Sequence, residues 1–327
     1  MQVTNAIVSD AHPLNNEAAI SDRSTFARSI RVFESVLDRF ASLPVAVIIV
    51  FSLIYLVPTS LIAARKLLWD DEFFTLYIST VSGWHELLRA LSTGADQHPP
   101  TFYYLTHLVL NTFGTNHVTL RLPAIFGFWL MCVLLYLLSR QLSGGVWGIL
   151  TMLLPLTSKT VYYYASEGRG YDLMLGFFML ALFSWMNAAR GSRRRLFIPL
   201  LGASLAAAVG SHYYAVLTAF ALALGELVRV VMRSKVDFPI ALAFCAAALP
   251  LVPFLSTIRD ARSYSEHFWA APAWQMILEF YPVALQGVVN VFLIALACGI
   301  FSLRRRNQPS IGTEQMKTAL PTWSLTA

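Results

Sequence analysis

The sequence predicts an all-α, polytopic membrane protein, and two observations support this prediction. The 327 residues are 57% hydrophobic and only 13% charged, and the mean hydropathy is +0.59. Soluble domains are about 45–50% apolar and about 25% charged. The apolar residues also fall in long runs of the length, about 20 residues, that an α-helix needs to cross a bilayer core. Together these observations predict a bundle of membrane-spanning helices.

Other features of the composition exclude several classes of protein. The three cysteines, Cys132, Cys245 and Cys298, lie far apart inside apolar runs and show no CxxC spacing, so neither a disulfide framework nor a metal cluster is indicated. The net charge of +6 indicates basic cytoplasmic loops rather than a nucleic-acid partner. The first 40 residues contain no apolar h-region, so we expect no cleavable signal peptide and an uncleaved first span.

Eight apolar stretches are candidates for spans. They are residues 44–64, 118–138, 146–164, 171–189, 196–213, 214–231, 239–256 and 283–303. A ninth stretch, 101–113, is shorter and contains His107 and Asn111. Whether this ninth stretch crosses the membrane decides the side of every later loop.

The basic residues favour a topology in which 101–113 does not cross. With a cytoplasmic N-terminus, 16 of the 24 basic residues then lie inside. These 16 are Arg23, Arg28, Arg31, Arg39, Arg140, Arg190, Arg193, Arg194, Arg195, Arg229, Arg233, Lys235, Arg304, Arg305, Arg306 and Lys317. A span at 101–113 would move the clusters at 190–195 and 304–306 outside, against the preference of Lys and Arg for cytoplasmic loops. We therefore predict eight spans, both termini in the cytoplasm, and an amphipathic helix on the outer surface at 101–113.

This topology divides the chain into three parts. Residues 1–43 form a cytoplasmic N-terminal segment, 44–303 a transmembrane domain, and 304–327 a polar cytoplasmic tail. The large first outer loop, 65–117, is expected to carry juxtamembrane helices and most of the candidate site. The outer loops are rich in acids and histidines, whereas the cytoplasmic loops hold arginine with few acids. We therefore expect any chemistry to face outward.

Residues 69–74 read WDDEFF and place concentrated negative charge directly after the first apolar run. A carboxylate there could accept a proton from a sugar hydroxyl as a general base, or hold a cation. The alternative is that the acids start a helix, where they complement its dipole. Asp71 and Glu72 would lie on different sides of such a helix, so one could serve chemistry while the other caps.

A histidine precedes two prolines in QHPPTFYY (97–104). Proline favours the first turn of a helix, and the residue before a proline favours extended backbone. We therefore expect His98 to be held just before the helix at 101–113, where its ring could contact a phosphate. The alternative is a structural turn in which the histidine is incidental.

Two later motifs carry charge beside apolar runs. Glu167 and Arg169 in ASEGRGYD (165–172) would be costly at that depth unless they are paired or used, and an ion pair closing a short loop is the alternative. Arg121 in TLRLPA would suit a phosphate, because guanidinium binds phosphate through two N–H groups, and the alternative is snorkelling to lipid headgroups.

Histidines supply the remaining candidates. His212 in GSHYY lies near an outer helix junction, where a packing role is the simpler interpretation. His267 in SEHFW has Glu266 beside it, so a divalent cation is a possible cofactor, although zinc usually needs three or four ligands. The sequence contains no GxxxxGK[ST], GxGxxG or GxSxG motif, so no nucleotide cofactor is indicated.

Five motifs occur together in one order: WDDEFF, QHPPTFYYLTHLVLNTFG, TLRLPAIFG, YYYASEGRGYDLML and GSHYYAVL. This series resembles the family 39-like branch of the GT-C glycosyltransferases, which includes protein O-mannosyltransferases and bacterial aminoarabinose transferases. The resemblance covers roughly residues 44–300. It implies a multi-spanning helical fold with a large first outer loop, and inverting sugar transfer from a polyprenyl-phosphate-linked donor on the outer face of the plasma (bacterial inner) membrane. The acceptor would be a lipid, a glycan or a protein.

The resemblance also implies roles for individual residues. Asp71 would match the catalytic acid, with Glu72 as its partner. The positions expected near the donor phosphate or substrate are His98, Arg121, Glu167, Arg169, Tyr171 and His212.

Two other functions fit the same sequence. One is a transporter or lipid flippase, although such proteins usually place ionisable residues or broken helices near the bilayer midplane. The other is a non-catalytic scaffold derived from a transferase, since family members commonly have more spans and an outer domain.

Overall fold

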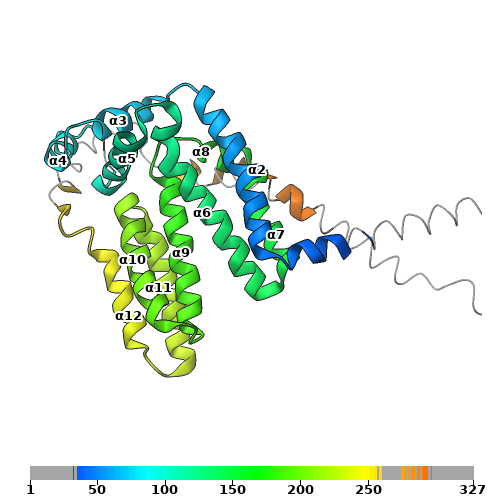
Figure 1. The fold of residues 1–327 in the computed structure, drawn as a ribbon. Helices are drawn as coiled ribbons and strands as arrows, with labels where there is room; N and C mark the ends of the chain where they lie inside the picture. Colours follow the sequence, from blue (N-terminus) through cyan, green and yellow to red (C-terminus); the bar gives the residue numbers. More distant parts are fainter. Residues whose placement is uncertain are drawn as a thin grey trace, which may run out of the picture.

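The computed structural model describes residues 35–96 and 98–255, together with Val32 and short pieces between 258 and 296. All regular secondary structure in these described residues is helical. The predicted all-α class is therefore confirmed. Figure 1 shows a bundle of long helices with the short helices α3, α4 and α5 gathered over one end.

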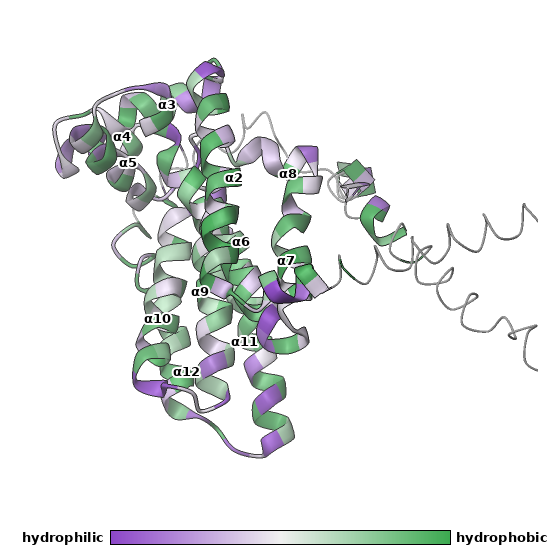
Figure 2. Ribbon diagram, turned by 45° about the vertical axis from the view of Figure 1, so that its right-hand side comes forward, coloured by the Kyte–Doolittle hydropathy of each residue, from purple (hydrophilic) through white to green (hydrophobic). Residues whose placement is uncertain are grey.

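Four of the described helices are long and apolar enough to cross a membrane. They are α2 (Pro44–Arg65), α6 (His117–Ser143), α9 (Tyr171–Ala189) and α11 (Ala215–Arg233). Figure 2 shows long hydrophobic stretches along the helices of the bundle, with hydrophilic residues concentrated toward the ends. These four helices coincide with predicted spans, and they identify the chain as a multi-pass membrane protein.

The predicted span at 146–164 is not one helix. It is divided into α7 (Gly145–Leu153), the 3-10 helix η1 (Leu154–Thr157) and α8 (Lys159–Tyr164). Pro155 explains the break, because proline lacks an N–H donor and its ring clashes with the preceding turn of an α-helix. The hydroxyl of Ser158 then caps α8 by accepting from the backbone N–H of Val161 at 3.3 Å.

Two further predicted spans differ from single long apolar helices. The stretch 196–213 forms α10 (Arg194–Ser211), an 18-residue helix that begins with two arginines. The stretch 239–256 begins with α12 (Phe238–Cys245) and η2 (Ala246–Ala248) and continues as turns. The span expected at 283–303 lies mostly outside the described residues. The total of eight spans therefore stays a prediction.

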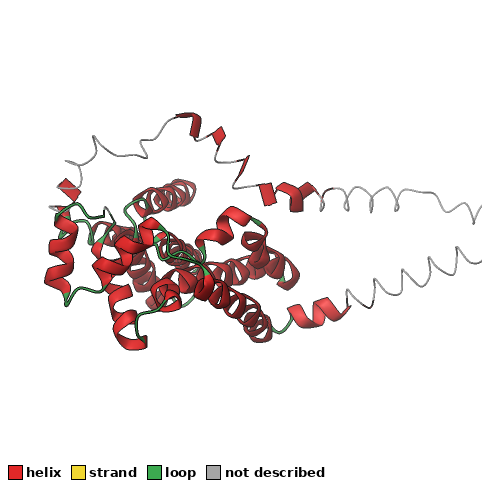
Figure 3. Ribbon diagram, turned by 90° about the horizontal axis from the view of Figure 1, so that it is seen from above, coloured by secondary structure: helices red, strands yellow, loops and turns green. Residues whose placement is uncertain are grey.

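The short helices over the end of the bundle are α3 (Asp70–Ser79), α4 (Trp84–Ser92) and α5 (Pro100–Phe113). Helix α5 covers the predicted surface helix at 101–113. Its 14 residues would extend only about 21 Å, less than the bilayer core. It ends at Gly114, whose φ of +80° is a conformation that favours glycine. In the view from above, Figure 3, the short helices lie across the ends of the longer ones.

The close crossing of α6 and α9 places the candidate site. A Cβ atom built on Gly127 of α6 would lie 2.4 Å from the backbone of Asp172 and Leu173, and one on Gly176 of α9 would lie 2.5 Å from the carbonyl oxygen of Gly127. Small residues allow two helix backbones to approach in this way. The crossing therefore holds the loop before α9, residues 165–170, against the first turns of α6.

Candidate functional site

The first polar group of the site is built around a fully buried ion pair between Arg121 of α6 and Glu72 of α3. Arg121 Nε donates to Glu72 Oε1 at 2.7 Å, and Arg121 Nη2 donates to Glu72 Oε2 at 2.6 Å. Both side chains are 0% exposed. The remaining guanidinium N–H groups donate to the carbonyl oxygens of Ala63, Lys66 and Leu67. We call this set the Arg121 cluster.

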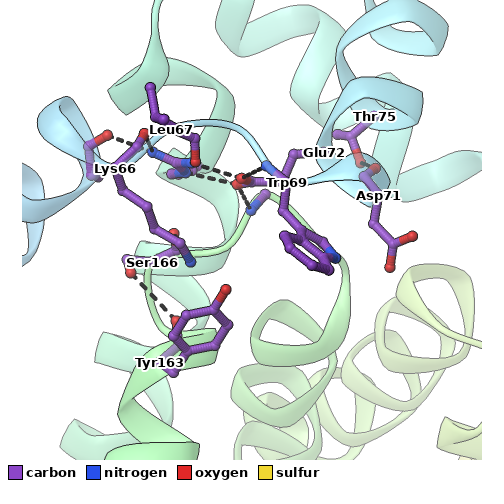
Figure 4. A network of polar contacts seen from close by, with 11 residues as sticks. Lys66, Leu67, Trp69, Asp71, Glu72, Thr75, Tyr163 and Ser166 are labelled. Atoms are coloured by element: carbon purple, nitrogen blue, oxygen red, sulfur yellow. Dashed lines mark hydrogen bonds and ion pairs between the residues drawn. The ribbon is translucent and has the colours of Figure 1, made fainter.

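Every polar atom of the two central side chains has a protein partner. Glu72 Oε1 also accepts from the backbone N–H of Gly168 at 2.7 Å, and Oε2 accepts from that of Trp69 at 3.0 Å. Burial alone would raise the pKa of Glu72, but the hydrogen bonds from Arg121, Gly168 and Trp69 outweigh it and lower the pKa. The cluster ties the end of α2, the start of α3 and the loop 165–170 to α6 (Figure 4). It leaves no N–H of Arg121 for a phosphate and no oxygen of Glu72 without a donor.

The second polar group is built around Arg169, whose side chain is 5% exposed. Its Nη1 donates to a carboxylate oxygen of Asp96 and to the backbone carbonyl of Asp71 at 3.1 Å. Its Nη2 lies 3.3 Å from the other Asp96 oxygen and 2.9 Å from Nδ1 of His98. Its Nε has no hydrogen-bond partner in the described part of the chain and lies 3.9 Å from Oδ2 of Asp71. We call these four residues the Arg169 cluster.

The Asp71 carboxylate is the accessible acid of this cluster. Its side chain is 36% exposed, against 0% for the neighbouring Glu72. Successive residues of an α-helix point about 100° apart, and in Figure 4 the Asp71 side chain points away from the Glu72 contacts. The two acids of WDDEFF thus have separate surroundings: Glu72 is buried and paired with Arg121, and Asp71 is partly exposed beside the buried Arg169.

Two aromatic rings, those of Tyr171 and His212, extend the Arg169 cluster beside His98. The centroid of the His98 ring lies 4.6 Å from that of His212 and 5.7 Å from that of Tyr171, and the last two rings are 5.0 Å apart. The backbone N–H of Tyr214 donates to Nδ1 of His212, so the proton of this neutral ring resides on Nε2. The predicted residues His98, Tyr171 and His212 therefore meet, although they come from three separate segments.

Glu167 occupies a separate buried position near both clusters. Its side chain is 5% exposed, and its Oε2 has no hydrogen-bond partner within the described residues. Burial raises the pKa of Glu167; the charge of Lys66 opposes this shift, and those of Glu72 and Asp71 add to it. Lys66 Nζ lies 3.7 Å over the ring of Tyr163 and donates to the carbonyl of Ser166 (Figure 4).

Sequence reasoning missed three contributors to the site. Asp96 is the main partner of Arg169. Its position two residues before the predicted site residue His98 could have identified it. Burial would raise the pKa of Asp96, but its contacts with His98 and Arg169 outweigh burial and lower the pKa. Gly168 supplies a backbone N–H to Glu72, and Lys66 supplies a further cation; no sequence pattern marked either residue.

Glu266 and His267, the proposed metal ligands, lie outside the described residues. Among the residues described, no group of three or more His, Cys, Asp or Glu side chains could hold a metal ion.

Long apolar helices below a cluster of acids, histidines and a buried arginine define a multi-pass membrane protein with its candidate chemistry at one end. Residues 97–257 match the model of the dolichyl-phosphate-mannose-protein mannosyltransferase family. This similarity over about half of the chain supports a membrane glycosyltransferase of the GT-C type. The resemblance found in the motifs is thereby confirmed. The matched segment includes His98, Arg121, Glu167, Arg169 and His212, whereas Asp71 and Glu72 precede it. No curated protein and no solved structure matches the chain.

Proposed function

We propose that the protein transfers a sugar from a polyprenyl-phosphate-linked donor to an acceptor hydroxyl, with inversion at the anomeric carbon and with Asp71 as general base. The acceptor is a lipid, a glycan or a protein. The observation that best supports this proposal is the position of Asp71, whose half-exposed carboxylate lies 3.9 Å from the buried guanidinium of Arg169. A general base needs this combination of access to substrate and a fixed orientation.

The reaction proceeds by displacement at the anomeric carbon. An oxygen of Asp71 takes the proton of the acceptor hydroxyl while the acceptor oxygen attacks from the face opposite the phosphate. The bond between the anomeric carbon and the phosphate oxygen breaks, and its electron pair leaves with the polyprenyl phosphate. Because this leaving group is a stable anion, fixed positive charge and hydrogen-bond donors contribute more than a strong acid.

The geometry refines the roles proposed for the cations. The Nη groups of Arg169 are occupied by Asp96, His98 and the Asp71 backbone, so we assign Arg169 to orienting Asp71 and maintaining positive charge behind it. Two groups are better placed to contact the donor phosphate: Nε2 of His98, since its Nδ1 is engaged, and the ammonium of Lys66. Tyr171 and His212 form the aromatic wall beside His98.

Glu72 and Arg121 receive a supporting role in this proposal. Their polar atoms are fully engaged with each other and with backbone groups, so neither contacts substrate. They instead fix the backbone immediately before Asp71, because Trp69 and Leu67 bond directly to the pair.

The test is transfer by the purified protein in lipid nanodiscs. Polyprenyl-phosphate sugars are supplied with candidate acceptors, the products are identified by mass spectrometry, and their anomeric configuration by NMR. We expect an inverted glycoside and released polyprenyl phosphate. Sugar flux across proteoliposomes without a product would favour a transporter, and donor binding without turnover would favour a non-catalytic scaffold; either result contradicts the proposal.

We also propose a location in the plasma (bacterial inner) membrane, with both termini in the cytoplasm and the Arg169 cluster facing outward. The distribution of basic residues supports this orientation. Single cysteines introduced at Ser82 in the loop between α3 and α4, and at Ser192 between α9 and α10, into a variant in which Cys132, Cys245 and Cys298 are replaced by serine, test it with a membrane-impermeant thiol reagent. Labelling of the first alone in intact cells is expected, and labelling of Ser192→Cys alone would reverse the orientation.

A further inference from the structure

A second polar site lies at the opposite end of the bundle from the Arg169 cluster. A pocket of about 720 Å³ is formed where α11 ends, where α12 begins and where α10 begins. In Figure 1 this region is the lower end of the bundle, whereas α3, α4 and α5 lie at the upper end. The lining side chains are Arg194, Arg229, Arg233, Lys235, Val236, Asp237, Phe238 and Pro239. We call this region the basic pocket.

Two of its four cations are held rigidly by acids. Arg194 binds both carboxylate oxygens of Asp237, at 2.6 and 2.9 Å. Arg229 binds both oxygens of Glu226, at 2.7 and 2.6 Å, and its Nη2 also lies 3.5 Å from Asp237. The indole N–H of Trp185 donates to the same Glu226, at 2.7 Å. These bonds hold Arg194 and Arg229 in place and neutralise two of the positive charges.

The other two cations leave an excess of positive charge. Arg233 and Lys235 are exposed, and neither forms an ion pair with any residue that the structure describes. Ser234 between them has a φ of +50°, a left-handed conformation in which the chain turns from α11 toward α12. Four cations facing two acids therefore present a local charge of about +2 at a fixed turn.

Exposed apolar side chains surround this charge. Val231 is 69% exposed and Met232 is 82% exposed in the last turn of α11, and Val236 and Phe238, which line the pocket, are 61% and 72% exposed. A free phosphate ion would gain nothing from such neighbours. A lipid headgroup would, because its phosphate lies at the depth of basic side chains while its acyl chains lie along apolar ones.

We propose that the basic pocket binds the headgroup phosphate of an anionic phospholipid, with Arg233 and Lys235 contacting the phosphate and the exposed side chains of α11 and α12 contacting the acyl chains. The site is separate from the proposed transfer reaction and does not depend on it. Binding here would fix the junction between α11 and α12 to the membrane surface.

The experiment measures lipid binding by native mass spectrometry of the full chain. The protein is released from micelles that contain phosphatidylglycerol and phosphatidylcholine, and retained lipid is counted. We expect selective retention of phosphatidylglycerol, weakened about 10- to 30-fold in the double variant Arg233→Gln/Lys235→Gln, since each basic residue near an anionic lipid surface contributes about 1 kcal/mol. Both side chains are exposed, so the variant is expected to fold.

A matched control removes the same charge at the same end of the bundle. Arg140→Gln/Arg190→Gln alters two basic residues at the ends of α6 and α9 that do not line the pocket, and it is expected to retain the lipid. Equal loss in both double variants would indicate only a general positive surface and overturn the proposal. Displacement of the lipid by millimolar inorganic phosphate, or equal retention of phosphatidylcholine, would also overturn it.

Discussion

Two arginines on neighbouring segments of the same site have opposite surroundings. Arg121 is fully buried, and each of its five N–H donors binds Glu72 or a backbone carbonyl. Arg169 is almost as buried, but its Nε has no hydrogen-bond partner among the described residues and faces the half-exposed Asp71. Every polar atom at the centre of the Arg121 cluster has a partner, whereas the Arg169 cluster includes the partly exposed carboxylate of Asp71.

In the proposed reaction, this difference assigns a supporting role to the Arg121 cluster and a reacting group to the Arg169 cluster. A buried ion pair with every donor and acceptor matched has no capacity for a ligand, and breaking it leaves an uncompensated charge. A buried cation beside an accessible carboxylate keeps that carboxylate oriented and leaves it free to react. The adjacent residues Asp71 and Glu72 thus have different surroundings, although the sequence presents them as one acidic run.

The largest effect is expected from Asp71→Asn. Loss of the general base should lower the rate of sugar transfer about 10³-fold, within the usual range for such catalysis. The thermal unfolding temperature should change little, because the side chain is partly exposed and makes no hydrogen bond through its carboxylate to the Arg121 cluster. Initial rates with a lipid-linked donor, and unfolding followed by size-exclusion chromatography in detergent, measure both quantities.

The control for this variant is Asp70→Asn, which removes the same charge from the preceding, exposed residue of α3. It should retain most of the activity. A fully active Asp71→Asn variant would remove Asp71 from the role of base.

The next largest effect is expected from Arg121→Lys, and it is an effect on stability. Lysine keeps the charge but cannot bind both oxygens of Glu72 and three carbonyls at once. We expect a loss of about 3 kcal/mol, comparable to breaking a buried pair, seen as a lower unfolding temperature and a lower yield of folded protein. Wild-type stability in this variant would contradict the supporting role of the Arg121 cluster.

The same substitution at the other arginine, Arg169→Lys, should act mainly on the reaction. The lost contacts with Asp96 and His98 should let Asp71 and His98 shift, and a misplacement of about 1 Å can cost about 10²-fold in rate. We expect kcat to fall more than KM rises, with a smaller loss of stability than in Arg121→Lys. If the two lysine variants lost equal stability and Arg169→Lys kept its kcat, the distinction between the two clusters would fail.

The smallest effect concerns Glu167 and depends on pH. Its pKa is raised above the ordinary value of 4.5, chiefly by burial, so ionising it destabilises the folded state. This penalty is absent below pH 4.5, grows as the pH rises, and is complete above the folded-state pKa. Glu167→Gln should therefore stabilise the protein at neutral pH and have little effect at pH 4, as unfolding temperatures across that range would reveal. A stability difference that is constant with pH would contradict this assignment.

Much of the fold could be predicted from the sequence because membrane helices are marked by local pattern. The predicted span 171–189 has the bounds of α9, and the predicted surface helix 101–113 differs from α5 by one residue. The division of 146–164 could have been anticipated from Pro155 and from the polar residues 157–160 that follow it. Prolines and acidic residues also marked where helices begin or break, because both act on the backbone within one helical turn.

The sequence by itself determined the helical membrane class, the family motifs and the residue types available at one end of the bundle. Only the tertiary structure decided which acid is buried, which is accessible, and that Asp96 is the partner of Arg169. The reason is that Glu72 and Arg121 are separated by 49 residues, and Asp96 and Arg169 by 73. Contacts over such separations depend on how α6 and α9 cross at Gly127 and Gly176, and no local pattern specifies that crossing.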